Sequence, residues 1–216
     1  LQALQLISTG TEQPGAKVYV EAPSYLSSLN IFQSVGARLC SMPMDEEGLL
    51  PWMSRETQDD TNHALLYTIP TFQNPTGIVM PTPRREKLLK YCNEMHIPII
   101  EDDVFRDLWL DSPPPPPIKS LDGHGNVVYI SSLSKCFAPG LRLGWLVGPE
   151  AVVQRLADVK MQMDYGVSVL TQQVAEELLR TGLYEKGVQN IRSQLAERRD
   201  FMIRLLEQYF SGEDDN

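Results

Sequence analysis

The 216-residue sequence contains only three cysteines and three histidines. Because Cys40, Cys92 and Cys136 are odd in number, widely spaced and without a Cys-x-x-Cys pair, a disulfide scaffold is excluded. Such cysteines are typical of reduced thiols in a cytoplasmic protein. The histidines are scattered and form no Cys/His zinc pattern. We therefore expect a cytoplasmic protein without a bound metal.

The sequence also lacks an excess of positive charge and any long apolar run. There are 19 Lys and Arg against 28 Asp and Glu, which gives a net charge of -9. This acidity argues against contacts between the chain itself and a phosphate backbone, but it allows a local basic pocket for one small anion. No apolar run reaches the roughly 18 residues of a membrane span. No basic segment followed by an apolar core opens the chain, so no secretory signal is predicted.

The composition is that of an ordinary globular protein, with 42% hydrophobic and 22% charged residues. Strands are predicted at Lys17–Glu21, Ala37–Met42, Ala64–Ile69, Ile97–Ile100, Val127–Ser131 and Leu143–Val147. Helices are predicted at 1–7, Tyr25–Ser34, Pro83–Met95 and from Pro149 to about Phe210, with breaks near 165–168 and 181–182. This alternation predicts an α/β fold with a mostly parallel sheet flanked by helices. Ligands of such sheets bind beyond the carboxyl ends of the strands.

The polar motif Ser-Leu-Ser-Lys follows the predicted strand at 127–131 and includes Ser132, Ser134 and Lys135. Arg142 lies seven residues further on, in the segment Gly-Leu-Arg-Leu-Gly. Glycines allow a close approach of the backbone to a ligand, and hydroxyls together with a guanidinium can hold a phosphate. The lysine can form a Schiff base with an aldehyde on the same ligand. The alternative is a solvated surface lysine beside ordinary turn glycines.

Three further motifs also follow predicted strands. Asp102, in the motif Glu-Asp-Asp, is suited to pair with a protonated pyridine nitrogen, or to collect Mg²⁺ together with Asp103 and Asp107. Asn74, in the turn Gln-Asn-Pro-Thr-Gly, is suited to donate to a phenolate-like oxygen. Tyr25 is suited to lie flat on an aromatic ring. The alternatives are solvated acids, a plain loop and a packing tyrosine.

These motifs occur in the order and at spacings compatible with the class I and II aminotransferases, which are pyridoxal-phosphate enzymes of fold type I. The sequence resembles this family over essentially its whole length. Within the family it is most similar to the branch of 2-aminoadipate and kynurenine aminotransferases and of the aminotransferase-like domains of MocR-type regulators in the GntR family. The resemblance implies a homodimer that transfers an amino group between an amino acid and a 2-oxo acid through a lysine Schiff base.

The resemblance also implies a role for each motif residue. Lys135 would bind pyridoxal 5'-phosphate covalently and then move the substrate's α-proton. Asp102 would pair with the pyridinium nitrogen, Asn74 would bind the ring's 3-oxygen and Tyr25 would stack on the ring. The phosphate would be held by Ser132, Ser134 and Arg142. Phe105 is a departure, because family members commonly have a tyrosine there that donates to the 3-oxygen.

By the same resemblance, residues 1–182 form most of the cofactor-binding domain. Residues 183–216 form a linking helix and the start of a smaller domain. The chain would then be about half of an aminotransferase, without part of the phosphate loop and without most of the smaller domain. We therefore expect these 216 residues alone to bind pyridoxal phosphate weakly or not at all, and not to transaminate.

Three functional hypotheses follow from the sequence. The first is an aminotransferase. The second is the effector-binding domain of a MocR-type regulator, in which nucleic acid is a partner only through a DNA-binding domain upstream of residue 1. The third is a magnesium-dependent phosphotransferase that uses Asp102 and Asp103, but the sequence contains no P-loop motif. The identity of the amino acid or oxo acid is not indicated.

Overall fold

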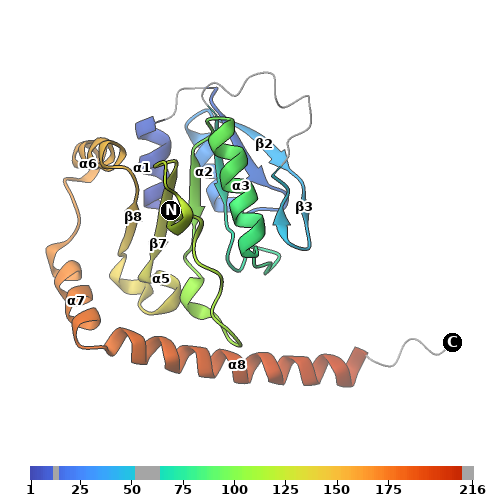
Figure 1. Cartoon of the computed structure of the whole chain (residues 1–216). Coiled ribbons are helices and arrows are strands. Elements are labelled where there is room, and N and C mark those ends of the chain that lie inside the picture. Colours follow the sequence, from blue (N-terminus) through green and yellow to red (C-terminus); the bar gives the residue numbers. More distant parts are fainter. Residues whose placement is uncertain (12–14, 52–63, 211–216) are drawn as a thin grey trace.

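A six-stranded sheet forms the centre of the fold in the computed structural model, which describes residues 1–11, 15–51 and 64–210 (Figure 1). Its strands are β1 (Lys17–Glu21), β2 (Arg38–Met42), β5 (Ala64–Thr68), β6 (Ile99–Asp102), β7 (Val127–Ser132) and β8 (Gly144–Val147). Their order is β2-β1-β5-β6-β7-β8. The pairs from β2 to β7 are parallel, whereas β7 and β8 are antiparallel. The prediction of an α/β fold with a mostly parallel sheet is confirmed.

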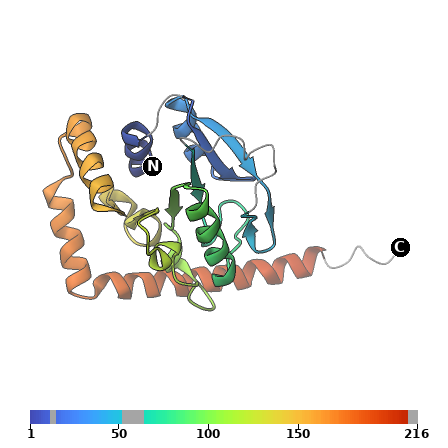
Figure 2. The ribbon, with the colours of Figure 1, turned by 45° about the horizontal axis from the view of Figure 1, so that its top comes forward.

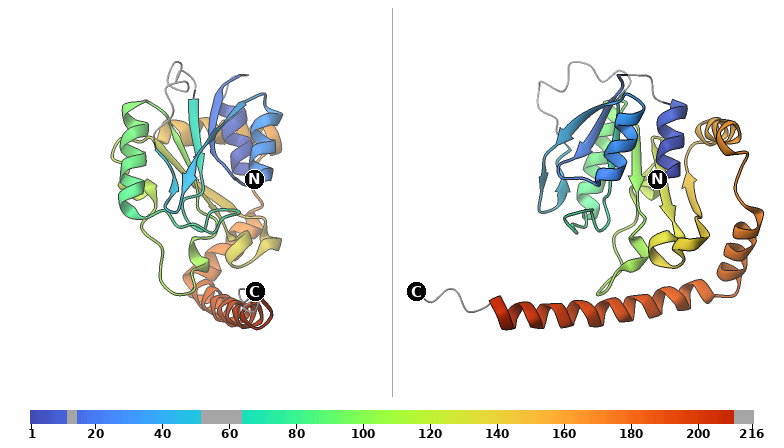
Figure 3. Two further views of the ribbon diagram at one scale, coloured as in Figure 1. Left: turned by 90° about the vertical axis from the view of Figure 1, so that its right-hand side faces the viewer. Right: turned by 180° about the vertical axis from the view of Figure 1, so that it is seen from behind.

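Helices cover both faces of this sheet. The longer ones are α1 (Gln2–Thr11), α2 (Leu26–Ser34), α3 (Thr82–Glu94), α6 (Glu150–Asp164), α7 (Val169–Arg180) and α8 (Leu183–Phe210). The shorter ones are η2 (Arg106–Leu108), α4 (Ile118–Leu121), α5 (Leu133–Cys136) and η3 (Pro139–Leu141), and a small separate sheet contains β3 (Met44–Asp45) and β4 (Gly48–Leu49). Figure 3 shows α3 on one side of the sheet and α1 with α2 on the other.

Two apolar clusters form the core, one on each face of the sheet. Successive side chains of a strand point to opposite faces, so Val18 and Val20 of β1 join one cluster while Tyr19 joins the other. The first cluster packs against α1, α2 and α6, and the second against α3 and α4. This two-sided burial explains why the central strands are almost entirely apolar.

The prediction that the strand near residue 100 ends at Ile100 was wrong, because β6 continues through two acidic residues to Asp102. Glu101 is fully buried inside the strand. Its carboxylate accepts hydrogen bonds from the backbone N–H groups of Ile118 and Lys119, each at 2.8 Å, and lies 3.7 Å from the Arg85 guanidinium. These partners compensate the cost of burying a charge. The carboxylate therefore has a structural role at the start of α4.

The helix α7 lies at one side of the domain, and α8 runs beneath the domain (Figure 2). The predicted breaks in the C-terminal helical region are confirmed, since α6 ends at Asp164 and α7 ends at Arg180. Near its start, α8 contacts Phe137, and a Cβ atom at Gly187 would lie 2.1 Å from the Phe137 ring. Only glycine allows this approach. Within the described ranges, no helix has the length and apolar character that a bilayer crossing requires.

Candidate functional site

A cavity of about 280 Å³ lies at the carboxyl edge of the sheet. It is lined by all seven residues predicted from the sequence, namely Tyr25, Asn74, Asp102, Ser132, Ser134, Lys135 and Arg142. The strands β1, β5, β6 and β7 are parallel, so the loops that follow them meet at this edge. Phe105 and the apolar residues Leu1, Ile69 and Val104 complete the lining. The structure thus brings the predicted residues together, while their roles toward a ligand remain predictions.

Arg142 reaches this cavity because β8 runs antiparallel to β7. The start of β8 therefore lies beside the end of β7, with Gly144 paired to Ser132. A Cβ atom at Gly144 would lie 2.8 Å from the carbonyl oxygen of Ser131, which explains the glycine after the arginine. Arg142 itself adopts φ 52°, a left-handed conformation that costs free energy in a non-glycine residue. Its guanidinium donates to the Pro139 carbonyl at 3.2 Å and to Ser134 Oγ at 3.4 Å.

The hydroxyls of Ser132 and Ser134 organise the turn that presents Lys135. Ser132 is the N-cap of α5, where its Oγ accepts a hydrogen bond from the Ser134 N–H at 3.1 Å. The Ser132 hydroxyl also donates to the Leu143 carbonyl at 2.9 Å, which ties α5 to the segment that carries Arg142. Lys135 lies on α5 with its side chain exposed at the cavity. Two hydroxyls, an ammonium and a guanidinium therefore line one region.

The Asp102 carboxylate is buried at the end of β6, with 7% of the residue exposed. Its Oδ2 accepts a hydrogen bond from Tyr67 Oη at 2.8 Å, whereas its Oδ1 has no partner among the described residues. Burial raises the pKa of Asp102 to about 6, and the Tyr67 hydroxyl acts in the opposite direction. Tyr67 was not among the residues predicted from the sequence. The signal that could have indicated it is the phenol that follows three apolar residues of β5.

A second buried carboxylate, also missed from the sequence, joins the loops that carry Tyr25 and Asn74. Glu21, at the end of β1, is 2% exposed and accepts a hydrogen bond from Gln73 Nε2 at 3.0 Å. The same amide group donates to the Pro23 carbonyl at 2.8 Å. Since Gln73 precedes Asn74 and Pro23 lies two residues before Tyr25, these bonds hold the two loops together.

The magnesium alternative is not supported by the positions of the three aspartates. Asp103 does not line the cavity but forms an ion pair with Arg106. Asp107 accepts a hydrogen bond from Tyr184 Oη at 2.5 Å. Within the part of the chain that the structure describes, no three His, Cys, Asp or Glu side chains converge as metal ligands would. The three aspartates therefore contact different neighbours.

Residues 2–213 match the class I and II aminotransferases. The chain belongs to this family. It has the aminotransferase domain fold, with the mixed sheet and flanking helices of the solved pyridoxal-phosphate enzymes. The kynurenine aminotransferase of Pyrococcus horikoshii, solved in complex with PMP, substrate and product, superposes with a TM-score of 0.90 at 35% identity. LysN, the α-aminoadipate aminotransferase of Thermus thermophilus, complexed with N-(5'-phosphopyridoxyl)-L-leucine, gives a TM-score of 0.89 at 32% identity.

Curated relatives of this aminotransferase-family chain include HTH-type transcriptional regulators. The HTH-type transcriptional regulator YdfD of Bacillus subtilis is 53% identical over 207 residues, which are 96% of this chain and 43% of the regulator. The HTH-type transcriptional regulator NorG of Staphylococcus aureus (strain bovine RF122 / ET3-1) is 39% identical over 97% of this chain and 47% of the regulator. The two superposed enzymes are covered over 53% and 54% of their chains, against 96% and 97% of this one. The chain thus spans about half the length of the proteins that it matches.

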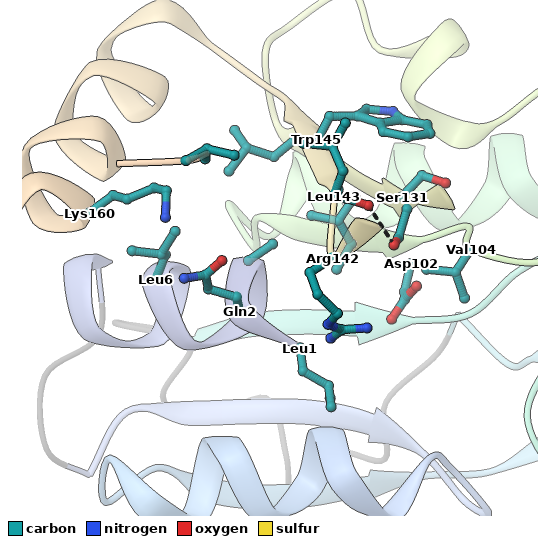
Figure 4. Close-up of a pocket in the computed structure, with 16 residues that line it drawn as sticks. Leu1, Gln2, Leu6, Asp102, Val104, Ser131, Arg142, Leu143, Trp145 and Lys160 are labelled. Carbon is teal, nitrogen blue, oxygen red and sulfur yellow. Dashed lines mark hydrogen bonds between the residues drawn. The ribbon is translucent and has the colours of Figure 1, made fainter. Parts of the chain in front are cut away.

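A second compartment of about 220 Å³ adjoins the cavity of this aminotransferase domain (Figure 4). Leu1, Asp102 and Arg142 line both spaces, and α1 contributes Gln2 to the second. Figure 4 shows the Arg142 side chain directed toward the space between Leu1 and Asp102. The Arg142 guanidinium favours an anion here, because its N–H groups form charge-assisted hydrogen bonds with anionic oxygens.

Proposed function

We propose that this domain binds pyridoxal 5'-phosphate, and that the protein containing it transfers amino groups between an amino acid and a 2-oxo acid. The observation that carries the proposal is the cavity at the carboxyl edge of the sheet. It combines the Lys135 amine, the Arg142 guanidinium and one oxygen of Asp102 that has no partner in the described part of the chain. The complex of the kynurenine aminotransferase with PMP and that of LysN with N-(5'-phosphopyridoxyl)-L-leucine support the same cofactor.

The side chains around the cavity fit this cofactor. Asp102 Oδ1, buried and without a hydrogen-bond partner among the residues that the structure describes, is suited to a protonated ring nitrogen, which would satisfy it. The Arg142 guanidinium and the hydroxyls of Ser132 and Ser134 are suited to a phosphate. Asn74 offers an amide donor to a ring oxygen, and Tyr25 offers a ring face. The bound cofactor would supply an aldehyde that condenses with amines and a pyridine ring that accepts electrons.

In the proposed mechanism Lys135 has two tasks. Its Nζ atom would hold the cofactor covalently, and as a free amine it would accept a proton from the substrate's α-carbon. Asp102 keeps the ring nitrogen protonated. Phe105, which lines the cavity where many family members have a tyrosine, provides no hydroxyl. The hydrogen bond to the ring's 3-oxygen is then left to Asn74.

We also propose that the protein is a cytoplasmic homodimer, with 183–216 as the start of a second domain. Exposed apolar side chains on the C-terminal helices support a surface that further chain or a second copy covers. They include Val169, Leu170, Leu179, Phe201, Ile203 and Phe210. The three free cysteines support a reducing compartment.

The proposed phosphate site predicts that Arg142→Ala weakens pyridoxal phosphate binding by about 10- to 100-fold, the cost of losing charge-assisted hydrogen bonds. Binding of pyridoxal, which lacks the phosphate, should change little. Titrations of the full-length protein with both compounds, followed by absorbance, measure this difference. Arg155→Ala is the matched control, because Arg155 is exposed on α6 and lines neither compartment. An equal loss for both compounds would contradict the assignment of Arg142.

A second function, favoured by the 53% identity to an HTH-type regulator, is that of an effector domain in a transcription factor. In that case the full-length gene product contains a DNA-binding domain upstream of residue 1 and binds duplex DNA with a steep salt dependence. The net charge of -9 is compatible with this, since the DNA contacts would lie outside this chain. A gel-shift titration with and without pyridoxal phosphate tests it. A full-length protein that transaminates rapidly and binds no DNA would reject this second function.

A further inference from the structure

A chain of buried hydroxyls lies behind the Asp102 carboxylate. Tyr67 Oη donates to Asp102 Oδ2 at 2.8 Å, and Ser28 Oγ lies 2.9 Å from Tyr67 Oη. Both Ser28 and Tyr67 are fully buried, and neither lines the cavity. A phenol has one hydroxyl proton, and Tyr67 uses it in the hydrogen bond that it donates to Asp102. The Ser28 hydroxyl must therefore be the donor in its hydrogen bond with Tyr67. The hydrogen bonds therefore run from Ser28 to Tyr67 to Asp102.

The Tyr67 ring is held in place by its surroundings. Phe32 contacts it edge-on, with ring centroids 5.5 Å apart and planes at 63°. Phe32 and Ser28 both belong to α2, so this helix supports both the ring and its hydroxyl. Burial and the charge of Asp102 raise the pKa of Tyr67 well above its ordinary value. The phenol thus keeps its proton and stays a donor at any ordinary pH.

The two oxygens of Asp102 consequently differ. Oδ2 is occupied by Tyr67, while Oδ1 has no partner among the described residues, and Asp102 lines both compartments. A hydrogen bond to an ionised carboxylate makes it a weaker base. We propose that Tyr67 is a positioning residue, which directs Asp102 Oδ1 toward the cofactor and keeps the shared proton on the cofactor's ring nitrogen. This assignment rests on the proposed function.

Other charges near Asp102 do not depend on Tyr67. Glu21 at the end of β1 and Asp103 directly after β6 are the neighbouring carboxylates that act on Asp102. Lys135 and Arg142 line the same cavity as the cationic groups. All four remain in a Tyr67→Phe variant, so a change in the proton position would report the lost hydroxyl.

The experiment uses the full-length protein loaded with pyridoxal phosphate that carries ¹⁵N in the ring. In Tyr67→Phe we expect the ¹⁵N resonance to move toward that of a neutral pyridine, and the dissociation constant of the cofactor to rise about tenfold. Ser28→Ala should shift the resonance in the same direction by a smaller amount. Tyr19→Phe is the matched control, since Tyr19 is 1% exposed on β1 but belongs to the core cluster on the opposite face. It should leave the resonance at the wild-type position.

A Tyr67→Phe resonance equal to that of Tyr19→Phe would overturn the positioning role. If Tyr67→Phe does not fold, Ser28→Ala decides, because it retains the phenol: an unshifted resonance overturns the proposal and a shifted one supports it. Failure of the proposed function would give a different result. The wild-type protein would then take up no pyridoxal phosphate, and the positioning role would be overturned as well.

Discussion

Replacement of Lys135 by alanine is expected to abolish covalent attachment of pyridoxal phosphate to the full-length protein. Lys135 lines the cavity at the carboxyl edge of the sheet, and an amine is required to bond the aldehyde carbon. Borohydride reduction followed by mass spectrometry should find a cofactor-modified peptide containing Lys135 in the wild type and none in the variant. Transamination should fall by at least about 10²–10⁴-fold, the usual contribution of a general base.

Lys160→Ala is the matched control for this experiment. Lys160 lines the adjoining compartment, where its ammonium forms an ion pair with Asp164 at 2.8 Å. This variant should retain both the modified peptide at Lys135 and the visible absorbance of the cofactor. A Lys135→Ala protein with an unchanged absorption spectrum would show that another residue holds the cofactor, or that none does.

The second large effect is expected for Asp102→Asn. An amide carries no charge to stabilise a protonated ring nitrogen, and loss of one partner of a buried charge pair costs about 3–5 kcal/mol. We expect kcat to fall by about 10²–10³-fold, with the cofactor still covalently attached. The Asn side chain keeps the shape of Asp102 and retains an oxygen that can accept from Tyr67. Stopped-flow measurement of the half-reaction with a saturating amino acid gives the rate.

The same variant should not be less stable, which separates a catalytic loss from a folding defect. The pKa of Asp102 is raised from 3.8 in the unfolded chain to about 6 in the folded one. Its contribution to stability is therefore fully present below pH 3.8 and is lost as the pH rises through about 6. Without cofactor, Asp102→Asn should show less of this decline between about pH 4 and 7 in urea titrations. A variant that unfolds more easily than the wild type at about pH 7 would contradict this.

The loops of the site could be predicted because the patterns that indicate them lie within short stretches of the sequence. Short apolar runs separated by helical periodicity indicate a parallel sheet, and parallel strands bring the segments after them to one edge. Tyr25 and Asn74 follow such strands and Asp102 ends one. Their position at one edge of the sheet could therefore be predicted from the parallel direction of the strands alone. The residue types then indicated the chemistry.

Arg142 was different, because it precedes a strand. In an all-parallel sheet that position would lie at the opposite edge, away from Lys135. Only the antiparallel pairing of β7 and β8 places it beside Ser132 and Ser134. The direction of a strand depends on its partners and on the length of its connections, which periodicity does not report.

The sequence by itself thus determined the α/β class, the order of the motifs and the residue types that line the cavity. The tertiary structure decided which buried polar groups act together: the hydroxyls of Ser28 and Tyr67 behind Asp102, and Glu21 between two loops. Each of these contacts joins residues at least 35 positions apart. The physical reason is that a buried polar group must find its partner wherever packing brings a complementary group into reach. That depends on side chains from different elements, so no local pattern reveals it.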